Sequence, residues 1–590
     1  MILLFRGQTL RSTIFKHPLQ RQIFANTPKR LKSYKIQTNI EQVKNLTDHH
    51  NSTGKRFFTK RRILIGSIIG IGVFYYETNE NVHSLLKHIY LLSKRVGIVA
   101  NATIRCFYYY KQVLNIKFET NEERLKALSE CHLRCANITL RALEKNGGIF
   151  IKLGQHVSAM TYVLPPEWTQ TMIPLQDRCP ESTVEEIDSM FAQDLKLHID
   201  EIFEKFNSKP IGVASLAQVH TAVLKETGEK VAIKCQHPSL KEFIPIDIML
   251  TQTVFNLLDI VFPEYPLTFI GDELQTSIYV ETDFIKEAKN AVLTEENFKN
   301  YKKQTALRIP KVIAAYKRIL IMEYITGNKL DDLKFLEENN ISRSEVSSCL
   351  SHIFNRMIFT PNIGVHCDPH GGNLAIRLKP QNDLNNPHNF EIILFDHGLY
   401  RYPSTELRRD YAKFWLSLFD HDIEKMKFYA KRFANISDEQ FPLFAAAVTG
   451  RSIDTVLNRD INSVRSQAEI DEMTEGILTG QHLSNLMSIL STIPRIVLLI
   501  LKTNDLTRYL DESLHNPLGP ERTFLIMSQY CAKLIFDESI EENDELNQIG
   551  SIKWIFQYVK NWIKYEIRIN KLFIYDTILW IHQHFNRLSI

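Results

Sequence analysis

The segment GVHCDPHGGN at residues 364–373 decides the fold, together with LFDHG at residues 394–398. His366, Asp368 and Asn373 keep the spacing H-x-D-x4-N, and Asp396 follows a hydrophobic, strand-like run. This pattern places one carboxylate near a transferred phosphate, and gives its metal ion a carboxamide and a second carboxylate. The two segments therefore predict a catalytic Asp368 and a Mg²⁺ site formed by Asn373 and Asp396.

Two further pieces precede these segments in the order found in protein kinases. VAIK at residues 231–234 predicts a strand that ends in Lys234, whose ammonium would face nucleotide phosphates. Glu287, on a predicted helix around residues 284–296, is placed to pair with that lysine. The alternative, a surface ion pair and two helix caps or turns, explains each piece but not their common order. Strands and one helix followed by mostly helical sequence predict an α+β, two-lobe fold.

The glycine-rich phosphate loop of protein kinases is replaced by PIGVASLAQVH at residues 210–220. Alanine and valine restrict the backbone and add Cβ atoms where a backbone would approach phosphates. No A-P-E segment follows Asp396 either. The chain therefore departs from ordinary protein kinases at the phosphate-binding loop and in the segment after Asp396.

Several short segments together resemble the UbiB/ADCK family of atypical kinase-like proteins. They are KLGQ at residues 152–155, the loop at 212–217, Glu281-x-Asp283, HCDPHGGN at 366–373 and DHG at 396–398, with LP at 164–165 and LQD at 175–177. The similarity covers about residues 120–430. It implies an atypical protein-kinase-like fold with an N-terminal helical extension over the active site, and it implies ATP and Mg²⁺ as cofactors.

The resemblance also implies a role for each matching residue. Lys234, Glu287 and Asp368 would be catalytic, with Asn373 and Asp396 on the metal. The nucleotide would contact Lys234, the loop residues Gly212, Val213, Ala214 and Ser215, and the backbone of Glu323, Tyr324 and Ile325. A gate that keeps ordinary protein substrates out would consist of Lys152, Gln155, Glu281 and Asp283.

The same resemblance implies a kinase or ATPase that affects the level or distribution of coenzyme Q or another mitochondrial lipid. The alternative is a catalytically vestigial, nucleotide-gated lipid-binding or scaffold protein, and ordinary protein phosphorylation fits poorly. The coenzyme Q biosynthesis branch has Ala-Ala-Ala-Ser where this chain has Gly212-Val213-Ala214-Ser215. The chain therefore looks like a fungal-type member outside that branch. Cys367 replaces the family's usual alanine with a group of similar size.

The N-terminal region has the composition of a mitochondrial targeting segment. Residues 1–62 contain fourteen Lys or Arg and two acids, whereas the whole chain carries a net charge of only +4. A disordered basic tail is the alternative. The small net charge gives no indication of a nucleic-acid partner.

Residues 61–78 contain an uncharged run, ILIGSIIGIGVFYY at 63–76, that we expect to be one transmembrane helix. The run is short against the roughly 20 residues needed to span a bilayer, but arginines and tyrosines at its ends extend it. A secretory signal is the rival interpretation. Basic residues before the run and acidic residues after it predict a body in the intermembrane space, anchored to the mitochondrial inner membrane.

The remaining boundaries follow from these segments. We expect a targeting segment at 1–60, a helical linker at 79–120, the helical extension at 121–208, the smaller lobe at 209–327 and a helical larger lobe at 328–590. The aromatic helical sequence at 551–590 is expected to pack on the larger lobe rather than on a membrane.

Overall fold

The computed structural model describes residues 80–159, 164–176, 179, 181–263, 268–381, 385–449, 489, 492–516 and 519–588. The predicted targeting segment and transmembrane helix lie outside these residues. The chain divides into two units between His88 and Ile89, and the described residues belong to the second unit except for the start of helix α2.

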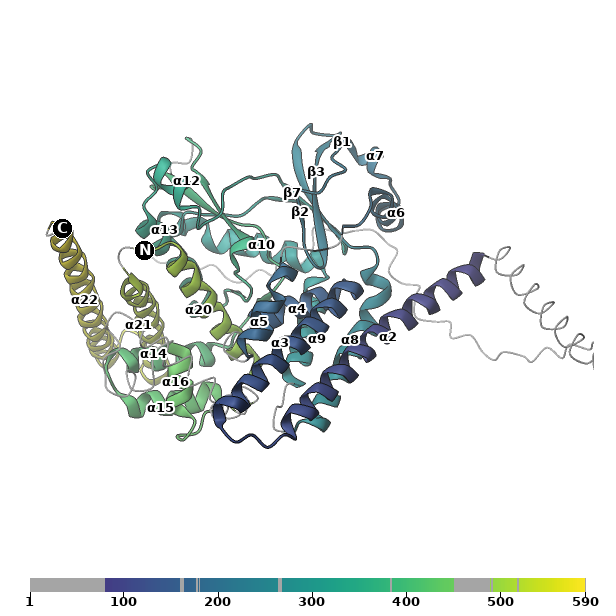
Figure 1. Cartoon of the computed structure of the whole chain (residues 1–590). Helices are drawn as coiled ribbons and strands as arrows, with labels where there is room; N and C mark the ends of the chain where they lie inside the picture. Colours follow the sequence, from purple (N-terminus) through teal and green to yellow (C-terminus); the bar gives the residue numbers. More distant parts are fainter. Residues whose placement is uncertain are drawn as a thin grey trace, which may run out of the picture. The chain divides into compact units, whose positions relative to one another are not determined.

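The smaller lobe is built on an antiparallel sheet of six strands (Figure 1). Its order is β1-β3-β4-β7-β6, with β2 paired to β3. The strands are β1 (Phe203–Phe206), β2 (Gly212–Val213), β3 (Ala217–Leu224), β4 (Lys230–Gln236), β6 (Val312–Ala315) and β7 (Ile319–Glu323). Their alternating side chains bury Val231, Ile233 and Ile321 in a core completed by α6 (Val184–Leu195). The lobe therefore begins at β1, six residues before the predicted boundary.

The expected linker contains the long helix α2 (Glu80–Leu114). The expected helical extension contains α3 (Asn121–Asn146), α4 (Ile149–Ala159), α5 (Pro166–Met172), η1 (Ile173–Gln176), α6 and α7 (Ile199–Ile202). Thr183 caps α6 in a reciprocal arrangement with Glu186, and Pro165 precedes α5. Pro165 at the N-cap and Pro166 at the first position of α5 thus mark the start of this helix.

Two helices between β4 and α10 (Phe284–Phe298) go beyond the single helix expected in this lobe. They are α8 (Leu240–Val261) and α9 (Thr268–Glu281), which pack against each other and against α4. Pro245 lies inside α8, which explains why the sequence did not indicate a continuous helix there. By length and composition alone, α8 is the one helix in the described ranges that is apolar enough to span a bilayer, and this is weak evidence.

The larger lobe is mostly helical, as expected. Its helices are α12 (Leu333–Glu338), α13 (Arg343–Phe359), α14 (Thr405–Phe419), α15 (Ile423–Ala434), α16 (Phe441–Thr449), α20 (Arg495–Ser513), α21 (Gly519–Leu546) and α22 (Ile552–Leu588). Short helical turns η2 (Lys299–Tyr301) and α11 (Lys302–Thr305) precede them. Aromatic residues of α14, α15 and α16 fill the core, with Phe414 and Phe433 in edge-to-face contact.

Two small sheets hold the predicted catalytic segments. Strand β10 (Phe390–Leu394) pairs with β9 (Leu374–Leu378) and with β5 (Leu307–Arg308). Strand β8 (Val365–His366) pairs with β11 (Tyr400–Arg401), and η3 (Gly371–Asn373) follows β8. The segments around Asp368 and Asp396 are therefore both anchored by strands.

Candidate active site

Lys234 is the centre of an ion cluster between the sheet and the larger lobe. Its Nζ atom lies 2.6 Å from Glu287 Oε1 on α10 and 2.8 Å from Asp396 Oδ2. The predicted Lys234–Glu287 pair is thus present, and Asp396 joins it. Strands β3 and β7 flank Lys234 on both sides, so its backbone position is fixed by two ladders.

Asp368 contacts lysines from two other parts of the chain. Lys502 Nζ on α20 lies 2.9 Å from Asp368 Oδ1, and Lys152 Nζ on α4 lies 3.6 Å from Oδ2. Lys152 also lies 2.9 Å from Glu281 Oε2 at the end of α9. Both oxygens of Asp368 therefore face an ammonium group.

Burial and neighbouring charge act in opposite directions on these groups. Burial alone would raise the pKa of Asp368, but Lys502 and Lys152 hold it well below its usual range. Burial likewise opposes the effect of Lys234 on Asp396, and the lysine prevails and lowers the pKa of that carboxyl. Both aspartates are therefore ionised across the physiological range.

Glu287 responds differently, because it shares its lysine with Asp396. Burial raises the pKa of Glu287 to about 7, against the opposing effect of Lys234. Burial would lower the pKa of Lys234, but Asp396 and Glu287 together raise it above its usual range. Glu287 is thus the member of this cluster that most readily takes up a proton.

His366 joins the two catalytic segments. The backbone N–H of Asp368 donates to His366 Nδ1 at 3.0 Å, and His366 Nε2 lies 3.0 Å from the carbonyl oxygen of Asp396. With Nδ1 accepting, the proton of the neutral ring is on Nε2, which donates to Asp396. Burial lowers the pKa of His366, which keeps the ring in this neutral form.

The four predicted gate residues divide between two places. Lys152 and Glu281 lie in the ion cluster at Asp368. Gln155 links the extension to the loop after β2, because Ser215 Oγ donates to Gln155 Oε1 at 3.2 Å. Asp283 instead stands at the N-cap position of α10 without a side-chain capping hydrogen bond, and its Oδ2 lies 3.6 Å from Lys286 Nζ. The structure therefore brings three of the four to the ion cluster and to the loop beside it.

Gly154 allows α4 to pack closely on η1. A Cβ atom at this position would lie 2.1 Å from Leu175 Cδ1 and 3.1 Å from Leu143 Cδ1. At Gly212, by contrast, a Cβ atom would meet nothing within 4 Å. The glycine of the KLGQ segment is thus required by packing, whereas the glycine of the loop is not.

We expect Gly154→Ala to lower the free energy of unfolding by about 1–3 kcal/mol, the usual effect of overpacking. Gly212→Ala is the matched control and should leave the melting temperature unchanged. Thermal unfolding followed by circular dichroism compares the two. Equal melting temperatures would show that Leu175 moves aside and that the close approach is not needed.

The loop at residues 212–215 forms the strand β2 and a tight turn. The N–H of Ala214 donates to the carbonyl of Ala217 at 2.8 Å, and Val213 pairs with Gln218 across the hairpin. The segment predicted to contact the nucleotide through its backbone begins at Glu323, the last residue of β7, whose side chain pairs with Arg308 at 2.7 Å. Tyr324 and Ile325 lie beyond the strand, so their backbone groups are outside the sheet ladder.

The residues at the predicted metal position fit Mg²⁺. Asn373 donates its Nδ2 to the carbonyl of Asp368 at 3.0 Å, which directs the amide and leaves its oxygen for a cation. Asp396 is ionised, and its Oδ1 accepts from the N–H of Gly398 at 2.7 Å. One carboxylate, one amide oxygen and substrate phosphates are the ligands that Mg²⁺ takes in kinase sites.

Buried atoms without partners support this fit. Oε2 of Glu287, Oε1 of Glu281 and Nε2 of His156 are buried and form no hydrogen bond in the described structure. Such atoms are rare in folded proteins unless a ligand or water satisfies them. They lie on α10, α9 and α4, the elements that carry the lysine and carboxylate cluster.

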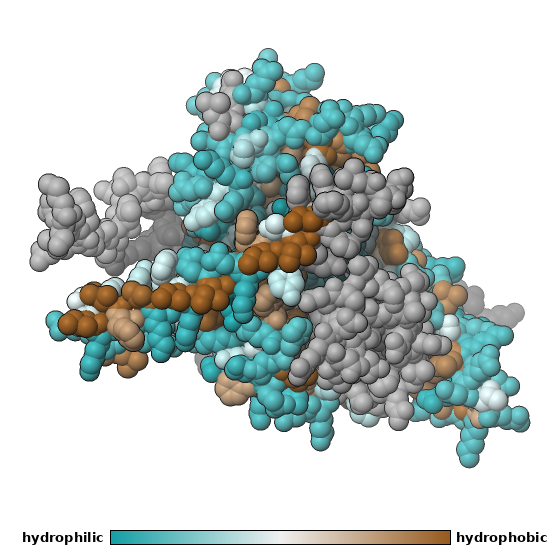
Figure 2. All heavy atoms as spheres, turned by 90° about the vertical axis from the view of Figure 1, so that its left-hand side faces the viewer, coloured by the Kyte–Doolittle hydropathy of each residue, from teal (hydrophilic) through white to brown (hydrophobic). Residues whose placement is uncertain are grey.

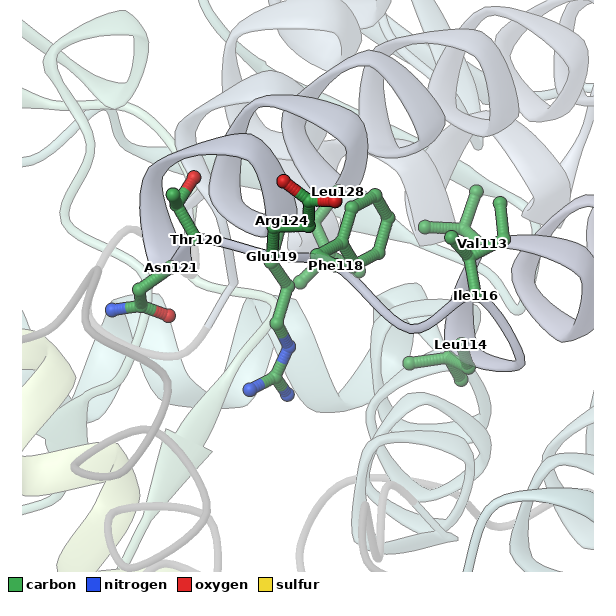
Figure 3. A pocket seen from close by; sticks show the side chains of 9 residues that line it. All are labelled: Val113, Leu114, Ile116, Phe118, Glu119, Thr120, Asn121, Arg124 and Leu128. Atoms are coloured by element: carbon green, nitrogen blue, oxygen red, sulfur yellow. The ribbon is translucent and has the colours of Figure 1, made fainter.

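A separate pocket of about 430 Å³ lies at the turn from α2 to α3 (Figure 3). Phe118, Glu119 and Arg124 are among its lining residues, and none of the cluster residues lines it. No group of three or more His, Cys, Asp or Glu side chains suited to a metal occurs in the described ranges. The lysine cluster is therefore the candidate site.

Lys502 is the one residue of this cluster that the sequence did not indicate. It lies 134 positions after Asp368, on helix α20, whose sequence contains no recognisable catalytic motif. The only signal is a lysine that follows the apolar run IVLLIL at residues 496–501. A lysine beside such a run needs a buried partner or an exit to solvent.

Comparison with known proteins shows the family to which this chain is similar. Residues 174–430 match the ABC1 atypical kinase-like domain. The chain is 64% identical to the ABC1 family protein MCP2 of Saccharomyces cerevisiae over 527 residues, which is 88% of this chain and 92% of that protein. It is 34% identical to AarF domain-containing protein kinase 1 of Xenopus laevis, over 74% of this chain and 82% of that one.

Among solved structures, the complex of Rv3197 with erythromycin from Mycobacterium tuberculosis is similar at 18% identity and a TM-score of 0.39. That match covers 67% of this chain and 95% of the other.

Proposed function

Since the chain belongs to the ABC1 family of atypical kinase-like proteins, we propose that it binds ATP with Mg²⁺ and transfers or hydrolyses the terminal phosphate beside Asp368. One observation carries the proposal. Lysines from β4, α4 and α20 converge on two ionised aspartates between the two lobes. An anionic, metal-bound phosphate chain needs this combination of positive groups and oxygen ligands.

Asp396 and Asn373 would hold Mg²⁺, which offsets negative charge on the phosphate oxygens. Lys234, positioned by Glu287, would face the same oxygens. Asp368 keeps its negative charge near neutral pH, so it orients the incoming hydroxyl or water by accepting a hydrogen bond. It does not have to take up a proton early in the reaction, which agrees with a loose transition state for phosphoryl transfer.

The placement of Lys152 supports a small substrate. Helix α4 brings Lys152 between Asp368 and Glu281, with only 12% of its side chain exposed. An extended protein segment would have to displace this buried ion pair. The proposed substrate is therefore a small molecule or water. Phosphate release from ATP by the purified chain, with and without Mg²⁺, tests the reaction.

A second function, a nucleotide-gated protein without turnover, is favoured by one observation. Both oxygens of Asp368 are engaged by lysines, so neither is free for a substrate hydroxyl. Calorimetry separates the two functions. Tight binding of Mg²⁺-ATP without phosphate release under any condition supports gating, whereas steady release supports catalysis.

The physiological role that we propose is the control of coenzyme Q or another mitochondrial lipid, in a branch outside coenzyme Q biosynthesis. The motif resemblance and the basic leader support it. Lipid analysis of mitochondria containing wild-type protein or Asp368→Asn tests this role. Identical lipid profiles at equal protein levels would oppose it.

The proposed location is the mitochondrial inner membrane, with the body in the intermembrane space. The charge asymmetry around residues 63–76 supports it. Protease treatment should digest the body in mitoplasts whose outer membrane is opened, and should leave it intact in whole mitochondria. Protection in both preparations would place the body in the matrix.

A further inference from the structure

Helix α22 has two faces, and only one of them packs against the protein. On the packed face, Trp554 Nε1 donates to Asp544 of α21 at 2.7 Å. The rings of Tyr565 and Phe536 stack with centroids 4.8 Å apart, and Leu572 is fully buried. The expected packing of this helix on the larger lobe therefore accounts for one face.

The opposite face carries an exposed row of apolar side chains, here called the apolar stripe. Ile552 is 87% exposed, Phe556 71% and Ile567 53%. Steps of three, four or seven residues place the members on one side of the helix. They are Ile552, Phe556, Val559, Ile563, Ile567, Ile574, Ile578 and Ile581. Figure 2 shows this stripe facing the viewer, along the helix that lies at the left of Figure 1.

Lysines accompany the apolar stripe along one edge only. Lys553, Lys560, Lys564 and Lys571 follow one another at intervals of seven, four and seven residues, and all four are exposed. No ion pair between them and a carboxylate is found within the described part of the chain. Glu566 interrupts the stripe midway, and it is half-buried.

From these observations we propose that α22 docks on a bilayer surface containing anionic lipids. The apolar stripe would lie below the headgroups, and the four lysines would contact lipid phosphates. A long helix with an apolar face and a lysine edge has the properties of interfacial membrane helices. Trp562, 46% exposed at the border of the stripe, suits the level of the headgroups.

A second copy of the chain fits this surface less well. Two such helices would need an acidic row opposite the lysines, as paired helices usually have. Besides Glu566, the one acidic residue of α22 is Asp576, which lies on the packed face, 3.4 Å from Arg522 of α21. The charge pattern therefore favours anionic lipid, and the proposal is independent of both the catalytic site and residues 63–76.

The chain has five tryptophans, so the difference in fluorescence quenching between wild type and Trp562→Phe tests the proposal. This difference reports on α22 even if another segment also binds membrane. The probes are phosphatidylcholine vesicles with and without phosphatidylglycerol, with brominated acyl chains as quenchers. We expect quenching with the anionic vesicles, and loss of most of it in Trp562→Phe. Lys560→Gln with Lys564→Gln should weaken vesicle binding about 30-fold, from the typical attraction of about 1 kcal/mol for each lysine near an anionic surface.

The matched control carries Lys205→Gln and Lys225→Gln, two exposed lysines of the smaller lobe, and should behave as wild type. Quenching that is unchanged in Trp562→Phe, or equal in neutral vesicles, would overturn the proposal. A dimer in solution that Ile567→Asp dissociates would assign the stripe to a second copy and also overturn it. An unchanged melting temperature of each variant shows that the fold is kept.

Discussion

Asp396→Asn is expected to abolish the stabilisation that Mg²⁺-ATP gives to this protein. At a ligand concentration of 100 times Kd, binding stabilises a native state by about 2.7 kcal/mol. The wild-type melting temperature should therefore rise by several degrees. Asparagine keeps the shape of Asp396 but removes the charge that would hold Mg²⁺ and that now contacts Lys234. Differential scanning fluorimetry with ATP, with and without Mg²⁺, measures the effect.

Asp505→Asn is the matched control, because Asp505 forms a local ion pair with Arg508 near the surface of α20. Its Mg²⁺-dependent shift should equal that of wild type. A full shift in Asp396→Asn would remove Asp396 from the metal site. A changed melting temperature without ligand would instead reveal how much the Lys234 cluster contributes to folding.

Lys502→Met is expected to reduce ATP turnover by about 100-fold or more, the usual effect of removing one preorganised charged group from a reaction centre. Lys502 lies 2.9 Å from Asp368, and only 16% of its side chain is exposed. Its loss would leave Asp368 with Lys152 as the one remaining lysine partner in the described structure. Steady-state phosphate release gives the turnover number, and calorimetry gives the affinity for nucleotide.

Lys502→Arg keeps the charge and should restore a measurable part of the turnover. Because the lost interaction concerns Asp368, the affinity for Mg²⁺-ATP should change much less than the turnover number. Equal losses in both variants would indicate a packing role on α20. Full activity of Lys502→Met would remove this lysine from the reaction.

The sequence predicted those parts of the site that lie in short, continuous segments. Lys234, Asp368 and Asp396 are each set by a strand and by a fixed spacing to their neighbours, so local pattern was sufficient. Lys502 reaches Asp368 only through the packing of α20 in the larger lobe, and no local spacing encodes such a long-range contact.

Two other features show the same limit. Helix α8 was not predicted because it contains Pro245. A proline inside a helix removes a backbone donor and normally indicates a helix end. On α22, apolar and aromatic residues occur on both faces, with Trp554 on one and Phe556 on the other. Periodicity identified a helix there, but it could not tell which face would find a partner.

Helix α4 contacts both lobes within one helical turn. Lys152 binds Asp368 of the larger lobe, and Gln155, three residues later, binds Ser215 of the smaller lobe. A change in the separation of the lobes therefore changes the contact of Lys152 with Asp368 or that of Gln155 with Ser215. A nucleotide that draws the lobes together would change the affinity of the helical extension for a ligand. By thermodynamic reciprocity, a ligand bound to the extension would change the affinity for nucleotide by the same factor. An effector bound to the helical extension, far from any phosphate, would thus regulate nucleotide binding between the lobes.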